Sequence, residues 1–223
     1  MKARTKQITF TGLFCAVAYL SVFLFRFSGI GGFLTFDAKD AVLVLCGLFF
    51  GPWYGLGATL AVTLLEAVTA SSTGVWGLLM NFLSSGTFVL VSSVIYRRFR
   101  TLRGAIAALA AGILSTTLVM LPANLLITPL YMHVEREAVL SLLIPLLLPF
   151  NLLKSTCNAA LVLLLYKPLS GAMKRLQILP GKPSAYRLDR RTVLVVVAAV
   201  CLLALSVCLI IFRLGGTFEI FRR

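Results

Sequence analysis

Long apolar segments separated by short polar stretches make up most of this chain, and they restrict its fold more than any motif does. Hydrophobic residues account for 60% of the 223 residues and charged residues for only 13%, and the mean hydropathy is +1.00. This composition excludes an ordinary soluble domain and indicates a polytopic membrane protein. Because the hydrocarbon core offers no water to backbone groups, the spanning segments are expected to be helices. The predicted fold class is therefore all-α.

The apolar segments predict six core helices and one additional helix. The core spans are predicted near residues 8–25, 41–56, 58–71, 76–96, 104–130 and 142–166, and the additional span near 192–212. At about 20 residues per span, these helices leave no room for a soluble catalytic domain. The first span is followed by no small-residue cleavage site and is expected to be retained. We expect a six-helix membrane domain at 1–170, a basic linker at 171–191, and an appended transmembrane helix with its tail at 192–223.

The net charge of +14 is concentrated at the ends of the predicted spans. Basic residues precede the first span, join the fourth to the fifth and follow the sixth: Lys2, Arg4, Lys6, Arg97, Arg98, Arg100, Arg103, Lys167, Lys174, Arg175, Lys182, Arg187, Arg190 and Arg191. The positive-inside rule then predicts a multi-pass protein of the cell membrane with a cytoplasmic N-terminus. Segments 26–40, 71–75 and 131–141 become outside loops. Membrane lipid is the expected electrostatic partner, and nucleic acid is not.

Lys154 is a cation in the middle of the sixth predicted span. Asn151, Lys154 and Asn158 follow one another at i, i+3 and i+7, so at about 100° per residue they share one helix stripe. A lysine at the centre of a bilayer costs about 2.5–3.5 kcal/mol, so it normally faces a partner, a cavity or a ligand. A buried ion pair or a snorkelling side chain is the alternative. The two neighbouring amides favour a polar binding cavity.

The other polar side chains of the core spans lie toward their predicted outer ends. The full set is Glu66, Asn81, Asn124, Asn151, Lys154 and Asn158. This one-sided depth predicts a pocket that accepts a solute from outside, with apolar walls from Leu34, Phe36 and Met80. Alternatively, each asparagine joins two helices, an interaction that contributes about 0.6 kcal/mol on average. On the first helix, Gly12 and Ala16 form a small-residue pair that permits close approach by another helix.

The sequence lacks the residue patterns that several kinds of catalytic chemistry require. The nearest approach to a phosphate-binding loop, at Gly181 and Lys182, is followed by Pro183 where Ser or Thr is needed, so ATP hydrolysis would come from another chain. His133 is the single histidine, and the five cysteines form no CxxC pair, so neither a metal site nor a disulfide framework is expected. The chain is therefore predicted not to be an enzyme. The catalytic alternative is an intramembrane acid–base pair of Glu66 and Lys154.

Four stretches, residues 36–40, 50–52, 73–82 and 95–98, resemble the substrate-binding S components of energy-coupling factor (ECF) vitamin importers. Two more, Asn124-Leu-Leu-Ile-Thr-Pro-Leu-Tyr-Met132 and Leu146-Leu-Leu-Pro-Phe-Asn-Leu-Leu-Lys154, are similar to the riboflavin-specific members. The resemblance covers residues 8–168. It implies a six-helix fold that binds riboflavin or FMN from outside, without a cofactor of its own. It also implies docking on one transmembrane coupling subunit and two ATPase subunits, which use the ATP.

The resemblance also implies roles for individual residues. Asn124, Asn151 and Lys154 would contact the flavin, and the loop around Leu34–Asp37 would act as a lid. The complete predicted substrate-binding set is Asn124, Asn151, Lys154, Asn81, Met80, Leu34, Phe36, Asp37, Glu66 and Asn158. Gly12 and Ala16 would form the patch for the coupling subunit. An S component for another vitamin, such as thiamine, is the alternative within the same family. The additional helix at 192–212 departs from the six-helix pattern.

Overall fold

The structure, a computed structural model, describes residues 3–24, 26–30, 34–69, 73–180, 190–212 and 217–219. Its helices are α1 (Ala3–Leu24), α2 (Lys39–Phe50), α3 (Pro52–Thr69), α4 (Gly74–Arg98), α5 (Leu102–Met132), α6 (Arg136–Leu142), α7 (Leu148–Arg175) and α8 (Arg190–Phe212). A π-helical turn, Leu143–Leu147, precedes α7. Three short strands are β1 (Arg26–Ile30), β2 (Leu34–Asp37) and β3 (Thr217–Glu219). The predicted all-α class is confirmed, with one small sheet added.

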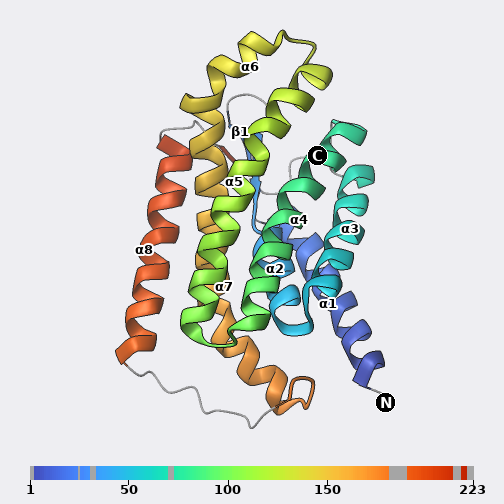
Figure 1. Ribbon diagram of the computed structural model, residues 1–223, viewed down its shortest axis with the longest axis vertical. Coiled ribbons are helices and arrows are strands. Elements are labelled where there is room, and N and C mark those ends of the chain that lie inside the picture. The colour runs from blue at the N-terminus through green and yellow to red at the C-terminus, as the bar shows by residue number, and fades with distance from the viewer. Residues whose placement is uncertain are drawn as a thin grey trace.

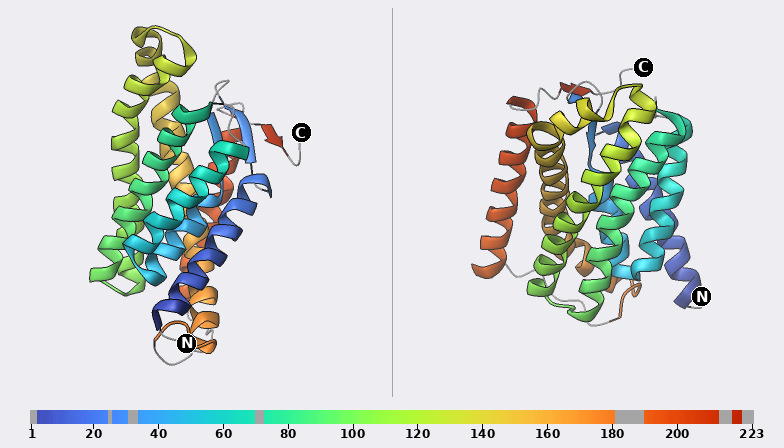
Figure 2. Two further views of the ribbon diagram at one scale, coloured as in Figure 1. Left: turned by 90° about the vertical axis from the view of Figure 1, so that its right-hand side faces the viewer. Right: turned by 45° about the horizontal axis from the view of Figure 1, so that its top comes forward.

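The long helices run up and down a single bundle (Figure 1). Five helical segments, 4–24, 74–98, 102–132, 136–175 and 193–212, are long and apolar enough to cross a membrane by length and composition. The N-terminus of α1 and the α4–α5 turn lie at one end of the bundle, which we call the basic end. The strands, the start of α4 and α6 lie at the other, which we call the pocket end (Figure 2). The chain therefore alternates between the two ends as the predicted spans require.

Helix α2 is short and almost completely buried in the bundle. It ends at Gly51, whose φ of 108° suits a residue without a Cβ, and α3 starts at once with Pro52. A Cβ at Gly55 would lie 2.8 Å from the Cα of Gly47, so the two glycines allow α2 and α3 to pack in close contact. The predicted boundary between the spans at 41–56 and 58–71 is therefore misplaced, because the chain reverses at the single residue Gly51.

Two further boundaries differ from those expected. Helix α6 occupies part of the predicted loop 131–141 and is held by the buried Val139. Helix α7 continues to Arg175, past the predicted end of the sixth span at 166. It continues because Leu169 and Met173 extend the apolar face that packs on the core. Its basic last turn also complements the helix dipole.

The predicted outside loop 26–40 contains two strands and the first turn of α2 rather than irregular chain. Strands β1 and β2 pair antiparallel, with Phe27 opposite Phe36 and Arg26 opposite Asp37. Strand β3, from the C-terminal tail, adds to the free edge of β1, so the strand order is β2-β1-β3. Helix α8 packs beside α7. The additional helix is thus docked against the six-helix core.

Candidate binding pocket

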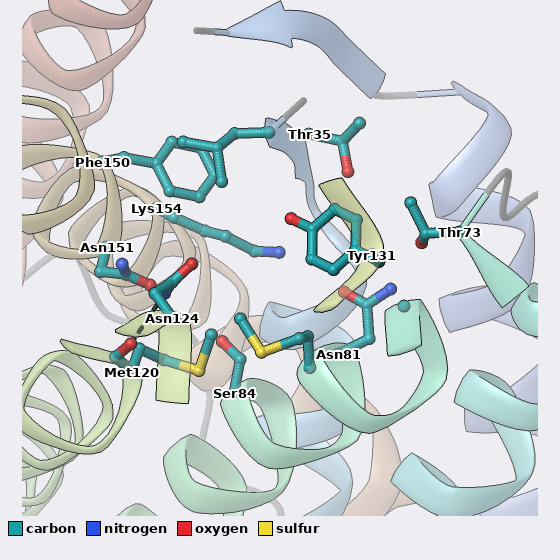
Figure 3. Close-up of a pocket in the computed structure, with 13 residues that line it drawn as sticks. Thr35, Thr73, Asn81, Ser84, Met120, Asn124, Tyr131, Phe150, Asn151 and Lys154 are labelled. Carbon is teal, nitrogen blue, oxygen red and sulfur yellow. Dashed lines mark hydrogen bonds between the residues drawn. The ribbon is translucent and has the colours of Figure 1, made fainter. Parts of the chain in front are cut away.

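A pocket opens at the pocket end between β2, α4, α5 and α7 (Figure 3). Its lining residues are Leu34, Thr35, Thr73, Gly77, Met80, Asn81, Ser84, Met120, Asn124, Tyr131, Phe150, Asn151 and Lys154. The helices form three of its walls and β2 forms the fourth. Its free volume is about 100 Å³, below the 300–1,000 Å³ or so that ligand pockets usually offer. A ligand of flavin size therefore requires a wall to move outward.

Helical periodicity explains why these side chains converge. Gly77, Met80, Asn81 and Ser84 lie at spacings of three and four on α4, so they share one face. Met120 and Asn124 share a face of α5 by the same spacing. Phe150, Asn151 and Lys154 begin α7, which follows directly from the π-helical turn Leu143–Leu147 and has Pro149 in its first turn.

Two buried asparagines stand side by side in the pocket. Asn124 donates from Nδ2 to the Met120 carbonyl at 2.7 Å, and Asn151 donates from Nδ2 to the Leu147 carbonyl at 2.7 Å. Thr128 donates to Oδ1 of Asn124 at 3.1 Å. These bonds within each helix fix the side chains, so both amides are held in place before a ligand arrives. Preorganised polar groups of this kind orient a ligand at little entropic cost.

Lys154 extends across the pocket toward Tyr131, with Asn124 and Asn151 on one side (Figure 3). Its Nζ lies 3.4 Å from Oδ2 of Asp37. An ammonium has three donors, and this ion pair engages one of them. Among the described residues that line the pocket, Lys154 is the one charged side chain. The remaining donors can therefore serve a ligand acceptor.

Asp37 joins Lys154 to a second buried lysine behind the pocket. Nζ of Lys39, which is 0% exposed, lies 2.8 Å from Oδ2 of Asp37 and 3.2 Å from Oε2 of Glu66. Burial would raise the pKa of Asp37, but the ammonium groups of Lys154 and Lys39 outweigh it and lower that pKa below its usual value. The carboxylate is therefore charged and fixes the Lys154 ammonium in position.

Asn158 ties the same region to the backbone of β2. Its Nδ2 donates to the Asp37 carbonyl at 3.1 Å and to the Lys154 carbonyl at 3.0 Å. Its Oδ1 accepts from the Ala41 N–H at 2.9 Å, which satisfies an unpaired donor in the first turn of α2. Asp40 accepts from the Ser85 hydroxyl at 2.5 Å. These contacts hold the end of β2 and the start of α2 against α7 and α4.

The structure divides the predicted substrate-binding residues into two groups. Leu34, Met80, Asn81, Asn124, Asn151 and Lys154 line the pocket. Asp37, Glu66 and Asn158 lie in the polar network behind it, and Phe36 packs in an apolar cluster with Phe150, Cys157 and Ile210. The predicted alternative of an ion pair for Lys154 also holds, since Asp37 is its partner, whereas Glu66 pairs with Lys39.

Several lining residues escaped the sequence analysis although a signal for most of them was present. Ser84 lies three residues after Asn81, Met120 four before Asn124, and Phe150 four before Lys154. Extending each polar position by one helical turn would have found all three. Thr35 and Thr73 lie outside the helices, and only the folded arrangement brings them to the pocket.

The predicted partner patch lies far from the pocket on α1. Gly12 and Ala16 are both exposed, and a Cβ placed on Gly12 would meet no other atom within 4 Å. Exposed apolar neighbours such as Leu13, Val17 and Leu20 continue the surface. The patch therefore faces away from the bundle and is not needed for internal packing.

The sequence profile of the ECF transporter substrate-specific component family matches residues 6–166, and the chain belongs to that family. It is 26% identical over 180 residues to the riboflavin transporter RibU of Staphylococcus aureus (strain TCH60), which covers 78% of this chain and 95% of that protein. It is 24% identical over 178 residues to the riboflavin transporter FmnP of Bacillus subtilis (strain 168), which covers 74% of this chain and 94% of that protein.

A solved S component of a bacterial ECF transporter shares the fold. The TM-score is 0.67 at 24% sequence identity, and the match covers 77% of this chain and 99% of that chain. The resemblance drawn from the sequence motifs is thereby confirmed. Membership of a transporter family also agrees with a multi-pass membrane protein whose task is transport.

Proposed function

We propose that this chain is the riboflavin-binding subunit of an ECF-type importer and that its pocket at the pocket end is the riboflavin site. The observation that carries the proposal is the convergence of Asn124, Asn151 and Lys154 on one pocket with apolar and aromatic walls. Similarity to two riboflavin transporters along most of the chain supports the choice of ligand.

The chemistry of the flavin ring matches this lining. Its pyrimidine edge alternates carbonyl acceptors with an N–H donor, and a carboxamide can both donate and accept. Lys154 supplies a further donor for a carbonyl oxygen. Met80, Met120 and Phe150 offer polarisable and aromatic surface to the ring faces. A flat heteroaromatic solute therefore uses both the polar and the apolar parts of the pocket.

Charge favours riboflavin over FMN and over thiamine. Around the pocket the ammonium groups of Lys39 and Lys154 face the carboxylates of Asp37, Glu66 and Asp40. This group carries no surplus positive charge for a phosphate. Thiamine has a permanently cationic ring, and the described residues that line the pocket offer it no carboxylate. A neutral flavin fits best.

The remaining parts of the importer come from other chains. We propose that the surface around Gly12 and Ala16 docks on the transmembrane coupling subunit, and that two ATPase subunits hydrolyse the ATP. The basic end then faces the cytoplasm, together with the N-terminus, and the pocket opens to the outside. Exposed small residues are the kind that let two membrane helices approach closely.

The catalytic alternative requires Glu66 and Lys154 to act together as an acid–base pair. Glu66 and Lys154 have different ionic partners, Lys39 and Asp37. Glu66 also does not line the pocket. A general acid and base must both reach the same substrate, so the geometry favours ligand binding over an acid–base reaction.

A fluorescence titration tests the proposed function. Riboflavin, FMN and thiamine are added separately to the purified full chain, with flavin quenching and thermal stabilisation as the two readouts. Riboflavin should quench and stabilise at micromolar concentrations or below, FMN should bind more weakly, and thiamine should do neither. Stabilisation by thiamine with no response to riboflavin would mean that thiamine, not riboflavin, is the ligand. No response to any of the three would reject the proposal.

A further inference from the structure

Helix α8 and strand β3 follow the part of the chain that matches the family. The matched region ends at residue 166, and this chain already covers 99% of the solved S component. The two elements are therefore additions to an S-component fold that is otherwise complete. Their position shows what they contact.

Strand β3 connects the C-terminal tail to a wall of the pocket. Thr217, Phe218 and Glu219 pair with Ser28, Phe27 and Arg26 of β1. Strand β1 pairs in turn with β2, which carries the lining residues Leu34 and Thr35. Edge addition of a strand supplies backbone hydrogen bonds that do not depend on side-chain identity.

Helix α8 reaches the same wall through side chains. Ile210, which is 0% exposed, packs in one cluster with Phe36 of β2 and Phe150 of α7. Val207 and Leu203, one and two turns earlier on α8, pack against this cluster. Strand β2 is thus linked to β3 through β1, and its Phe36 packs against Ile210 of α8.

This arrangement affects how a ligand can enter the pocket. Its free volume of about 100 Å³ is too small for a flavin. Three of its walls are long helices of the bundle, and the fourth is the two-residue lining segment of β2. The wall that can move without shifting a bundle helix is therefore the Leu34–Thr35 segment of β2 with its partner β1. We propose that α8 and β3 form a strap that holds β1 and β2 closed over the pocket and limits the rates at which ligand enters and leaves.

The ligand part of this inference rests on the proposed function, whereas closure by the strap does not. Hydrogen–deuterium exchange of the β1 and β2 amides in ligand-free protein therefore comes first. The full chain is compared with a chain lacking residues 213–223, which loses β3 and keeps α8. Ile210→Ala and Ile211→Ala form a matched pair, because the first side chain is 0% exposed and the second 38%. The strap predicts faster exchange in the deletion and in Ile210→Ala, but not in Ile211→Ala.

Stopped-flow measurement of riboflavin release follows with the same variants. Loss of two or three backbone hydrogen bonds should speed release by about tenfold or more in the deletion. Unchanged exchange in both the deletion and Ile210→Ala would overturn the strap. Faster exchange in a protein that binds no riboflavin would support the strap and reject the proposed ligand instead.

A disulfide provides a test that does not remove any element. Ser28 and Thr217 lie opposite each other in the β1–β3 register, so Ser28→Cys with Thr217→Cys should form a cross-link under oxidising conditions. Mass spectrometry identifies the linked peptides, with each single variant as the control. The strap predicts a cross-link that slows riboflavin release until reductant is added. A failure to cross-link would contradict the pairing on which the strap rests.

Discussion

At the scale of single residues, the buried charges decide how the pocket is built. Lys154 could be recognised from the sequence because it interrupts an apolar segment. Its partner Asp37 and the second cation Lys39 could not, because both belong to a stretch rich in glycine and charge that is typical of an exposed loop. Their burial follows from the tertiary position of α2 inside the bundle, which no local pattern encodes.

Replacing Lys154 with Met should weaken riboflavin binding by about 10- to 100-fold, because a hydrogen bond from a charged donor contributes about 1.5–3 kcal/mol. Lys174→Met is the matched control on the same helix, at the basic end. Equilibrium titration of flavin fluorescence measures both. Equal losses in the two variants would remove Lys154 from the site.

Replacing Lys39 with Met should destabilise the protein by about 3–5 kcal/mol, because it leaves Asp37 and Glu66 buried with one cation fewer. Adding Glu66→Gln to this variant should restore part of the loss, since one unpaired charge disappears. Thermal unfolding in detergent without ligand measures the series. If Lys39→Met alone unfolds at the wild-type temperature, the buried network does not stabilise the fold.

At the scale of helices and strands, apolar runs predicted the order of the helices and their alternation between the two ends of the bundle. Of the seven predicted spans, those that became α2 and α3 are not among the five helical segments long and apolar enough to cross a membrane. The apolar runs could not place the break between α2 and α3, because the apolar character continues across Gly51. They also gave no sign of β1, β2 or β3, which depend on pairing between distant segments. Helix α7 extends beyond its predicted end at 166 because Met173 still packs on the core, although basic residues begin at Lys167.

Gly112→Ala should destabilise the bundle by about 1–3 kcal/mol. A Cβ there would lie 2.3 Å from Oγ of Ser92 and 2.7 Å from the buried ring of Phe88, so α4 and α5 would have to separate. Gly12→Ala is the control, because its added Cβ meets open space. Thermal unfolding compares the two, and equal stability would mean that α4 and α5 do not pack as closely as described.

Gly12→Phe should leave riboflavin binding unchanged and reduce riboflavin uptake in cells that contain the coupling module. The bulky ring projects from the exposed face of α1 and keeps a partner helix at a distance. Lys154→Met, by contrast, should weaken riboflavin binding itself. Normal uptake by Gly12→Phe would move the docking surface elsewhere.

At the scale of the whole molecule, the fold brings together lining residues that are up to 120 positions apart in the chain, counting from Leu34 to Lys154. The sequence predicted that such residues would gather at one end of the bundle, because each lies near the same end of its helix. It did not predict which of them face the pocket and which stand behind it. That division depends on helix rotation and on β2, and both are set by packing.

The most direct measurement is an experimental structure of the purified full chain with riboflavin bound. We predict a flavin ring between Met80 and Phe150, with its carbonyl edge within hydrogen-bond distance of Asn124, Asn151 or Lys154 and with β2 displaced outward. Riboflavin bound elsewhere, or bound in this pocket with its carbonyl edge turned away from all three residues, would contradict it.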